Sequence, residues 1–316
     1  MKVIFAGTPD FALPALQALV ESAHEIVAVY TQPDRLAGRG RHLQPSPVKM
    51  FALKHRLTVL QPKSLKDPEV FQQLSLLQAD VMLVVGYGML LPESILTIPK
   101  YGCLNIHPSL LPKWRGASPV QASLLACEEV TGVTVLQVSK AMDAGPICQQ
   151  QQERIRSLET AGELYLRLFH IGAQLLLGVL QALSQGEFKT VAQDAAQASY
   201  CQKIQKSDAQ IDWQKSAIEI EYLVRAMNPT PVAFTHYRNQ PLRIWLVQAI
   251  EGITSKSAGT IVNMTKHTLD VSTGKGVLRL LSLQLPGKKQ MSVTDFINSQ
   301  RDYLQIGEVC FVTKLL

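Results

Sequence analysis

Apolar residues in the first half of the chain follow two alternating spacings. Short runs rich in Val, Ile and Leu predict buried strands, at residues 2–7, 25–31, 80–88, 103–108 and 132–139. Between the first two runs, residues 14–22 carry apolar side chains at helical spacing. Strands that alternate with helices in this way predict an α/β domain with a doubly wound, mostly parallel sheet covered on both faces.

Capping signals mark the starts of two helices. Thr160 with Glu163 forms a predicted capping box in front of a long apolar helix. Ser216 with Glu219 repeats the pattern before a second helix, which the Asn-Pro pair at 228–229 should stop.

The second half of the chain has a different pattern. From Ser184 the sequence becomes polar and rich in Ala and Gln, which predicts a linker at residues 189–207. β-rich runs separated by Gly and Pro turns follow, at residues 241–250, 259–265, 268–273 and 277–283. We therefore expect a first domain at residues 1–188 and a small β-barrel domain at residues 208–316.

The composition narrows the class of protein. The chain is 47% hydrophobic and 18% charged, and its longest apolar stretch, around Leu175 to Leu183, is interrupted by Gly178 and Gln181. The N-terminal residues lack the apolar core of a secretory signal. The five cysteines and seven histidines are dispersed without metal-ligand spacing. We therefore expect a cytoplasmic protein that binds no metal and enters no membrane. We also expect a monomer, although the composition does not determine the oligomeric state.

The charge is unevenly distributed along the chain. The formal net charge is +6, and residues 201–316 hold 14 Lys and Arg against 9 Asp and Glu. A basic second half favours a polyanionic partner such as nucleic acid, although mild basicity alone is a weak indicator.

The loop after the first predicted strand argues against a bound dinucleotide or ATP. Its sequence, AGTPDFA, contains a single glycine. The fingerprints GxGxxG and GxxxxGK[ST] need several glycines so that the backbone can approach phosphate, and neither occurs in the chain.

Polar residues lie at or just beyond the ends of two predicted strands. Asn105 and His107 alternate with Leu104 and Ile106, so both polar side chains should leave one face of their strand, near the edge where open α/β sheets place their sites. An amide donor beside an imidazole suits a carbonyl that becomes an oxyanion. Asp143 follows the next strand, where it can reach the histidine, fix its tautomer and favour its cationic form. Each motif alone is also compatible with side chains that only bond nearby backbone.

The segment after the second predicted strand, residues 31–49, is too long and too rich in Gly and Pro for an ordinary connection. It contains one acid, Asp34, and four basic residues: Arg35, Arg39, Arg41 and Lys49. Long loops in compact domains are usually functional, but a charged loop can also be only solvated surface.

Several of these motifs coincide in order and spacing with those of a known family. The matching text is FAGTPDFA, TQPDRLAGRGR, PSPVK, NIHPSLLPKWRGASP, TGVT and MDAGPI in the first half, and AQIDW, VRAMNPTP and LLSLQLPGKK in the second. On these motifs, which extend over essentially the whole chain, the protein resembles the folate-dependent formyltransferases, and among them those that act on methionyl-tRNA. Two departures are Leu36, where the family usually has proline, and Ser118, where alanine is common.

The resemblance implies both a fold and a reaction. The fold is a Rossmann-like formyltransferase domain, then a linker and an OB-like barrel. The reaction moves the formyl group of 10-formyltetrahydrofolate to the α-amino group of methionine on initiator methionyl-tRNA, without a metal. Asn105, His107 and Asp143 are then the expected catalytic residues.

The resemblance also implies two sets of binding residues. Folate is expected to contact Ser109, Leu110, Leu111 and Pro112, with the turn at 86–88 lining the pterin pocket. The tRNA is expected to contact the basic loop through Arg35, Arg39, Arg41 and Lys49, and to gain further basic contacts from the barrel.

Two other functions stay open on the sequence alone. A formyltransferase acting on a small amine, such as a ribonucleotide or an amino sugar, would not need the basic loop or the barrel. A catalytically inactive RNA-binding module would not need Asn105, His107 and Asp143 together.

Overall fold

The computed structural model describes residues 1–37, 42–252 and 255–313, and the chain divides into two compact units. The N-terminal unit comprises Met1–Pro119, Val130–Arg154 and Tyr165–Cys201. The C-terminal unit comprises Val120–Glu129, Ile155–Leu164 and Gln202–Leu316.

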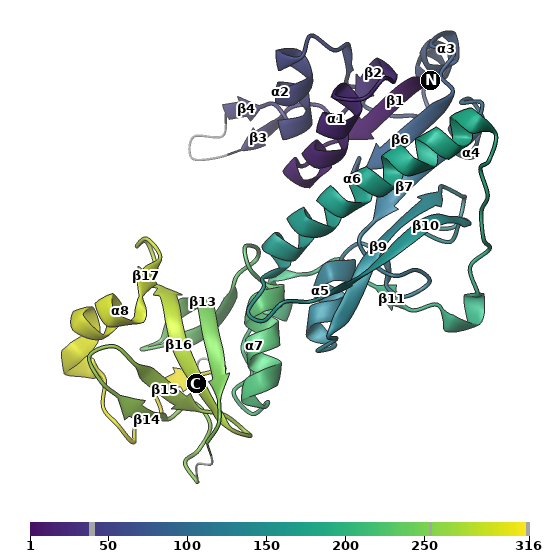
Figure 1. The fold of residues 1–316 in the computed structure, drawn as a ribbon. Helices are drawn as coiled ribbons and strands as arrows, with labels where there is room; N and C mark the ends of the chain where they lie inside the picture. Colours follow the sequence, from purple (N-terminus) through teal and green to yellow (C-terminus); the bar gives the residue numbers. More distant parts are fainter. Residues whose placement is uncertain (38–41, 253–254, 314–316) are drawn as a thin grey trace. The chain divides into compact units, whose positions relative to one another are not determined.

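A mainly parallel sheet forms the centre of the N-terminal unit (Figure 1). Its strands are β1 Lys2–Gly7, β2 Glu25–Tyr30, β5 Val59–Leu60, β6 Val81–Val85, β7 Cys103–His107, β9 Val130–Gln137 and β10 Ile147–Arg154. They lie in the order β10-β9-β7-β6-β1-β2-β5. The strands from β7 to β5 are parallel, which confirms the predicted fold class. β9 was expected to extend the parallel part, but it is antiparallel to β7, and β10 is antiparallel to β9.

Helices cover both faces of this sheet. The helices that begin in this half of the chain are α1 Leu13–Val20, α2 Pro47–Lys54, α3 Pro68–Leu76, α4 Glu93–Leu96, α5 Pro119–Leu125 and α6 Ala161–Gln185. On one face, Gly172 of α6 lies against Ile106 and Val133 of the sheet. On the other face, Leu74 of α3 and Ile95 of α4 belong to a buried apolar cluster with β1, β2 and β6. Short strands complete this unit: β3 Arg35–Ala37 pairs with β4 His42–Gln44, and β8 Arg115–Gly116 pairs with β11 Tyr200–Cys201.

α6 has the length and composition of a membrane-spanning helix, and it is the one helix with both properties in the described part of the chain. An 18-residue window within it has a mean hydropathy of 1.5. The sequence predicted no such run, because Gly178 and Gln181 interrupt it, yet the helix continues through both. Of that window, 44% is buried inside the protein, as in the core helix of an α/β domain.

Both predicted capping boxes are formed. Thr160 N donates to Glu163 Oε2 at 2.8 Å, and Glu163 N donates to Thr160 Oγ1 at 3.3 Å. Ser216 and Glu219 make the same reciprocal pair at 2.9 and 3.3 Å, at the start of α7 (Ala217–Ala226). Each box satisfies amide groups that a helix start would otherwise leave without partners.

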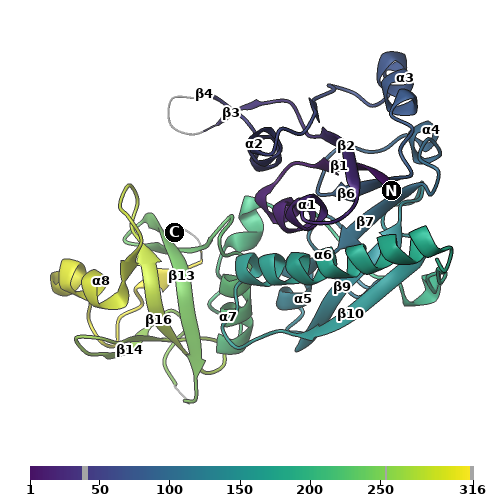
Figure 2. The same cartoon turned by 45° about the horizontal axis from the view of Figure 1, so that its top comes forward.

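An antiparallel sheet forms most of the C-terminal unit. Its strands are β12 Ala233–Tyr237, β13 Gln240–Ile250, β14 Ile261–Met264, β15 Leu269–Ser272, β16 Val277–Gln284, β17 Met291–Ser292 and β18 Phe311–Val312, and α8 spans Val293–Gln300. The order is β14-β15-β16-β13-β12-β18, and β17 pairs with β16. The long strands β13 and β16 lie side by side (Figure 2). The four predicted β-rich runs are therefore all strands.

The two ends of this sheet curl toward each other, as in an OB-like barrel. Thr260, just before β14, forms an antiparallel bridge with Val309, just before β18. Gly259 lies at this contact, where a Cβ atom would stand 2.1 Å from the carbonyl oxygen of Phe311, so a larger residue would push the ends apart. Inside the curl, Trp213 and Phe296 belong to one buried apolar cluster, which gives the unit its own core.

Candidate active site

Three polar side chains lie together near the carboxyl end of β7. Asn105 and His107 lie on this strand, and Asp143 lies in the loop between β9 and β10. Asn105 Nδ2 donates to Asp143 Oδ1 at 3.4 Å, and His107 Nδ1 is 3.6 Å from Asp143 Oδ2. The backbone N–H of Gly116 also donates to Asp143 Oδ2, at 3.0 Å. The structure thus brings together the three expected catalytic residues, and it adds a backbone donor that has no signature in the sequence.

Asp143 reaches this place by a longer path than the sequence pattern suggested. Because β9 is antiparallel to β7, its last residue, Gln137, pairs with Leu104 at the beginning of β7. The loop that follows must therefore return along the sheet to bring Asp143 beside His107. Gly145 lets the loop pass close to β9, since a Cβ atom there would lie 1.8 Å from the carbonyl oxygen of Gln137.

The buried imidazole of His107 is held in its neutral form. Its Nε2 lies 2.9 Å from the carbonyl oxygen of Trp114, and a carbonyl only accepts, so Nε2 carries the proton. Burial lowers the pKa of His107, and this effect outweighs the charge of Asp143 and the bond to Trp114, which both raise it. Asp143 thus favours the cation, as the sequence led us to expect, but burial outweighs its effect. Nδ1, which carries no proton in this tautomer, lies 3.6 Å from Asp143 Oδ2.

The segment expected to contact folate is held by hydrogen bonds within its own loop and to β9. Ser109 and Leu111 are buried, and Leu110 and Pro112 are partly exposed. Ser109 Oγ donates to a backbone carbonyl of the same loop at 2.6 Å. Thr134 Oγ1 on β9 accepts from the Leu111 N–H at 3.2 Å and donates to the Ser109 carbonyl at 2.6 Å. The hydroxyl of Ser109 is thus already bonded within the loop, and Leu110 and Pro112 offer the free surface.

The turn at residues 86–88 is held by a buried glutamine that the sequence did not single out. Gln32 Nε2 donates to the carbonyl oxygens of Tyr87 at 3.2 Å and of Gly88 at 2.7 Å. Thr8 Oγ1 donates to the same Tyr87 carbonyl at 2.9 Å. A polar residue two positions after the end of β2 was the one sequence signal for this role.

Two of the four basic residues expected to contact tRNA can be placed. Lys49 Nζ is 2.7 Å from Asp34 Oδ2, and Arg35 donates to the side-chain oxygen of Gln32. Hydrogen bonds from Gln61 and from Lys49 hold the pKa of Asp34 below its usual value. Arg39 and Arg41 lie outside the described residues.

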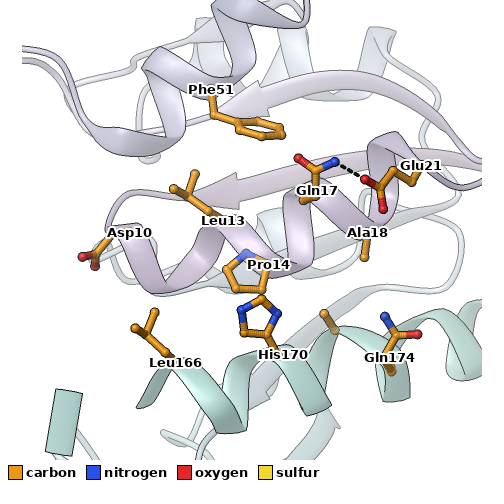
Figure 3. A pocket seen from close by; sticks show the side chains of 11 residues that line it. Asp10, Leu13, Pro14, Gln17, Ala18, Glu21, Phe51, Leu166, His170 and Gln174 are labelled. Carbon is orange, nitrogen blue, oxygen red and sulfur yellow. Dashed lines mark hydrogen bonds between the residues drawn. The ribbon is translucent and has the colours of Figure 1, made fainter. Parts of the chain in front are cut away.

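A groove of about 560 Å³ between α1 and α6 lies apart from these residues (Figure 3). Leu13 and Pro14 of α1, Phe51 of α2, and Leu166 and His170 of α6 are among the side chains that line it. None of the expected catalytic, folate-binding or tRNA-binding residues is among them. Over the described residues, no group of three or more His, Cys, Asp or Glu side chains could hold a metal ion.

Two formyl transferase family models match most of the chain. The Formyl transferase family matches residues 1–180, and the family described as Formyl transferase, C-terminal domain matches residues 203–301. The structure is similar to that of WlaRD, a sugar 3N-formyl transferase determined in the presence of dTDP and 5-N-formyl-THF. That likeness has a TM-score of 0.65 at 19% identity and covers 92% of this chain and 99% of the other, and it concerns the fold.

Two bacterial relatives narrow the class. The methionyl-tRNA formyltransferase of Coxiella burnetii (strain RSA 331 / Henzerling II) is 46% identical over 311 residues, which are 98% of this chain and 99% of the relative. That of Methylococcus capsulatus is 47% identical over 299 residues, or 95% of this chain and 97% of the relative. The chain belongs to the methionyl-tRNA formyltransferase family.

Proposed function

We propose that this chain transfers the formyl group of 10-formyltetrahydrofolate to the α-amino group of methionine on initiator methionyl-tRNA. The observation that carries this proposal is the 46% identity, over 98% of the chain, to a relative named methionyl-tRNA formyltransferase. The grouping of Asn105, His107 and Asp143 supports it, because an amide, a neutral imidazole and a carboxylate are the groups that acyl transfer to an amine needs.

In the proposed reaction the amine nitrogen attacks the formyl carbon, and the formyl oxygen becomes an oxyanion. Asn105 has two amide hydrogens, of which one points to Asp143 at 3.4 Å; the other has no partner among the described residues and can bond the oxyanion. Such a donor is worth on the order of a hundredfold to a thousandfold in rate. The bond from the formyl carbon to N10 of the folate then breaks, and the new amide remains on the methionine.

One proton must move from the attacking amine to the folate nitrogen. We assign this transfer to His107, whose Nδ1 is the unprotonated ring nitrogen and lies 3.6 Å from Asp143 Oδ2. The imidazolium that forms would be stabilised by the Asp143 carboxylate, while burial favours release of the proton to the leaving nitrogen. Asp143 thus acts on the transient cation and not on the resting imidazole.

The two substrates are proposed to occupy different surfaces. Folate would lie along Ser109, Leu110, Leu111 and Pro112, where Leu110 and Pro112 provide partly exposed apolar surface. The tRNA would be held by the basic loop, through Arg35, Arg39, Arg41 and Lys49, and by the basic C-terminal half. In that case Lys49 would exchange its partner Asp34 for a phosphate, a contact that positions the tRNA without reading its sequence.

The small-amine alternative is less well supported. The relatives that cover 95% or more of the chain at 45–47% identity are named for methionyl-tRNA, whereas the sugar formyltransferase is 19% identical. The inactive RNA-binding alternative does not explain why Asn105, His107 and Asp143 lie together.

The proposal is tested with the purified full-length chain, 10-formyltetrahydrofolate and three acceptors: initiator methionyl-tRNA, elongator methionyl-tRNA and free methionine. We expect formylation of the initiator to exceed that of both other acceptors by a wide margin in kcat/KM. Equal rates on all three acceptors would contradict the assignment to initiator tRNA. Formylation of a nucleotide-linked amino sugar without formylation of the tRNA would move the chain to the small-amine class.

A further inference from the structure

A glutamine 50 residues after Asp143 in the chain touches both loops that carry the site. Gln193 Nε2 donates to the backbone carbonyl oxygens of Asp143, at 2.8 Å, and Gly145, at 2.7 Å. Gln193 Oε1 accepts from Arg115 Nε at 3.0 Å and from Arg115 Nη2 at 2.8 Å. A guanidinium only donates and a backbone carbonyl only accepts, so the orientation of the amide is fixed and all four of its hydrogen-bonding positions are used.

The other end of this bridge is a buried cation. Arg115 is 5% exposed, and its guanidinium is bonded to neutral groups, Gln193 and, at 3.4 Å, the hydroxyl of Tyr200. The next residue, Gly116, donates its N–H to the Asp143 carboxylate at 3.0 Å. Gln193 therefore connects the backbone of Asp143 to Arg115. The neighbour of Arg115, Gly116, holds the side chain of Asp143.

The backbone around Gln193 is bonded to the same two loops. Val191 and Ile147 exchange both backbone hydrogen bonds at 2.8 Å, next to the Asp143 loop. On the other side, β11 pairs in parallel with β8, and Ser199 Oγ accepts from the Trp114 N–H at 2.9 Å. Residues 191–201, which fall within the linker expected from the sequence, are thus bonded to both the Asp143 loop and the His107–Gly116 loop.

We infer that Gln193 is a positioning residue for the transfer, which sets Asp143 opposite Asn105 and His107 by tying the two loops together. The inference rests on the proposed function for its kinetic consequences. The Asp143 loop must return along the sheet after β9, and Asp143 itself has a φ of 50°, in the left-handed region that is uncommon for non-glycine residues, although Asp adopts it more readily than most. A restraint from the surroundings would help to keep the loop in this conformation. The two bonds from Gln193 to the carbonyls of Asp143 and Gly145 provide that restraint.

The first test compares Gln193→Ala with Gln197→Ala, a matched change at an exposed glutamine of the same segment that bonds Asp194. We expect Gln193→Ala to lower kcat by about tenfold to a hundredfold, the cost of a misplacement near 1 Å, while KM for both substrates stays within about twofold. Gln197→Ala should match the wild type. Identical kinetics for the two variants would overturn the inference.

Two further variants separate positioning from folding. Gln193→Glu can still accept from Arg115 but cannot donate to the two carbonyls, so we expect it to lose kcat like Gln193→Ala. Full activity in Gln193→Glu would show that only the contact with Arg115 matters, and would overturn the inference. Added to Asp143→Ala, the Gln193→Ala change should cost little more, because the positioned group is already gone. Losses that multiply in this double variant would also overturn it.

A measurement without turnover distinguishes this inference from the proposed function. The ring nitrogens of His107 can be followed by NMR in the full-length chain, with their signals assigned by their loss in His107→Gln. We expect Gln193→Ala to move the Nδ1 signal toward its position in Asp143→Ala, and Gln197→Ala to leave it unchanged. An unmoved signal in Gln193→Ala overturns the positioning role even if the enzyme is active. A moved signal in a chain without formyl transfer supports the positioning role and overturns only the proposed function.

Discussion

Two carboxylates, one in each unit, show different uses of the same chemical group: Asp270, which is buried, and Asp143, which is partly exposed. In the C-terminal unit, Asp270 accepts hydrogen bonds from Arg279 Nε at 2.7 Å, Arg279 Nη2 at 2.9 Å and Asn263 Nδ2 at 2.8 Å. In the N-terminal unit, Asp143 has one close partner, the Gly116 N–H at 3.0 Å, and its side-chain neighbours are farther away, with Asn105 at 3.4 Å and His107 at 3.6 Å. The first carboxylate has its strong partners within the protein. The second keeps bonding capacity that a substrate can use.

The protonation states reinforce this contrast. Burial alone would raise the pKa of Asp270, but the hydrogen bonds from Arg279 and Asn263 and the charge of Arg279 outweigh it and lower the pKa. For His107 burial prevails, so the imidazole stays neutral beside a carboxylate. The fully hydrogen-bonded ion pair of Asp270 and Arg279 stabilises its unit. The neutral imidazole of His107, beside a carboxylate with fewer close partners, can instead accept a proton during a reaction.

The largest expected effect is on kcat, when a side chain is removed from the cluster of Asn105, His107 and Asp143. We expect Asn105→Ala to lower kcat by about a hundredfold to a thousandfold, the cost of a lost oxyanion donor. His107→Ala should cost about a hundredfold to ten-thousandfold, the usual contribution of a positioned acid or base. Both variants should fold and keep the KM for tRNA, because neither residue is placed at the proposed tRNA surface. Steady-state kinetics with initiator methionyl-tRNA measure these losses.

The cluster should also behave as a unit. Asp143→Ala alone is expected to lose most of its turnover, and combining it with His107→Ala should cost far less than the product of the single losses. Losses that multiply would mean that the two residues act separately. Near-normal kcat in any of the three single variants would remove that residue from the proposed site.

For the cluster of Asp270, Arg279 and Asn263 we expect the opposite pattern, a loss of stability without a loss of kcat. Asp270→Asn removes a charged acceptor from Arg279, so we expect the free energy of unfolding to fall by about 1–3 kcal/mol. The kcat per folded molecule should not change, since Asp270 lies in the C-terminal unit. Urea unfolding followed by activity of the native fraction checks both statements, and an Asp270→Asn variant with normal stability and low kcat would reverse the contrast.

The same variant has a defined pH dependence. The pKa of Asp270 is lowered on folding from its usual value of 3.8, so its stabilisation is fully present above that pH. As the pH falls through the lower pKa of the folded state, the carboxylate becomes protonated and this contribution is lost. The stability difference between wild type and Asp270→Asn should therefore be constant at neutral pH and shrink below pH 3.8. A difference that grew on acidification would be incompatible with a carboxylate held in its charged form.

The parts that the sequence predicted well have strong local signals. The buried strand β6, for example, is a continuous run of Val, Met and Leu, and the helix start at Ser216 carries its complete capping box. The grouping of Asn105 and His107 followed from the alternation of side chains along β7. By contrast, β10 was missed because it is a half-exposed strand of sequence ICQQQQER, which has no apolar period to detect.

The missed parts of the site depend on contacts between residues far apart in the chain. The direction of β9 is decided by its pairing with β7, and the same apolar run would serve a parallel or an antiparallel strand. Gln193 is one glutamine in a polar, Ala/Gln-rich segment, and only the folded chain shows that its amide meets Asp143 and Arg115. The neutral state of His107 also depends on its burial, which no spacing reveals.

The smallest expected effect concerns the basic surface of the C-terminal unit. A pocket of about 360 Å³ there is lined by Arg238 and Lys288 among other residues, and the guanidinium of Arg238 lies 3.6 Å from the ring centroid of Tyr303. Lys288 and Lys289 are exposed and belong to the half of the chain with 14 basic and 9 acidic residues. If this surface attracts tRNA through its phosphates, these lysines contribute to affinity and not to chemistry.

We therefore expect the double variant Lys288→Ala/Lys289→Ala to bind initiator tRNA more weakly, with a log–log salt slope reduced by about one to two. Its kcat at saturating tRNA should equal that of the wild type, in contrast to the variants of Asn105 and His107. Lys66→Ala, at an exposed lysine of the N-terminal unit, is the matched control and should leave the slope unchanged. Binding titrations at several salt concentrations give the slope directly. An unchanged slope in the double variant would exclude this pair from the tRNA surface, and a lowered kcat at saturation would mean that the C-terminal unit also takes part in aligning the substrate for the reaction.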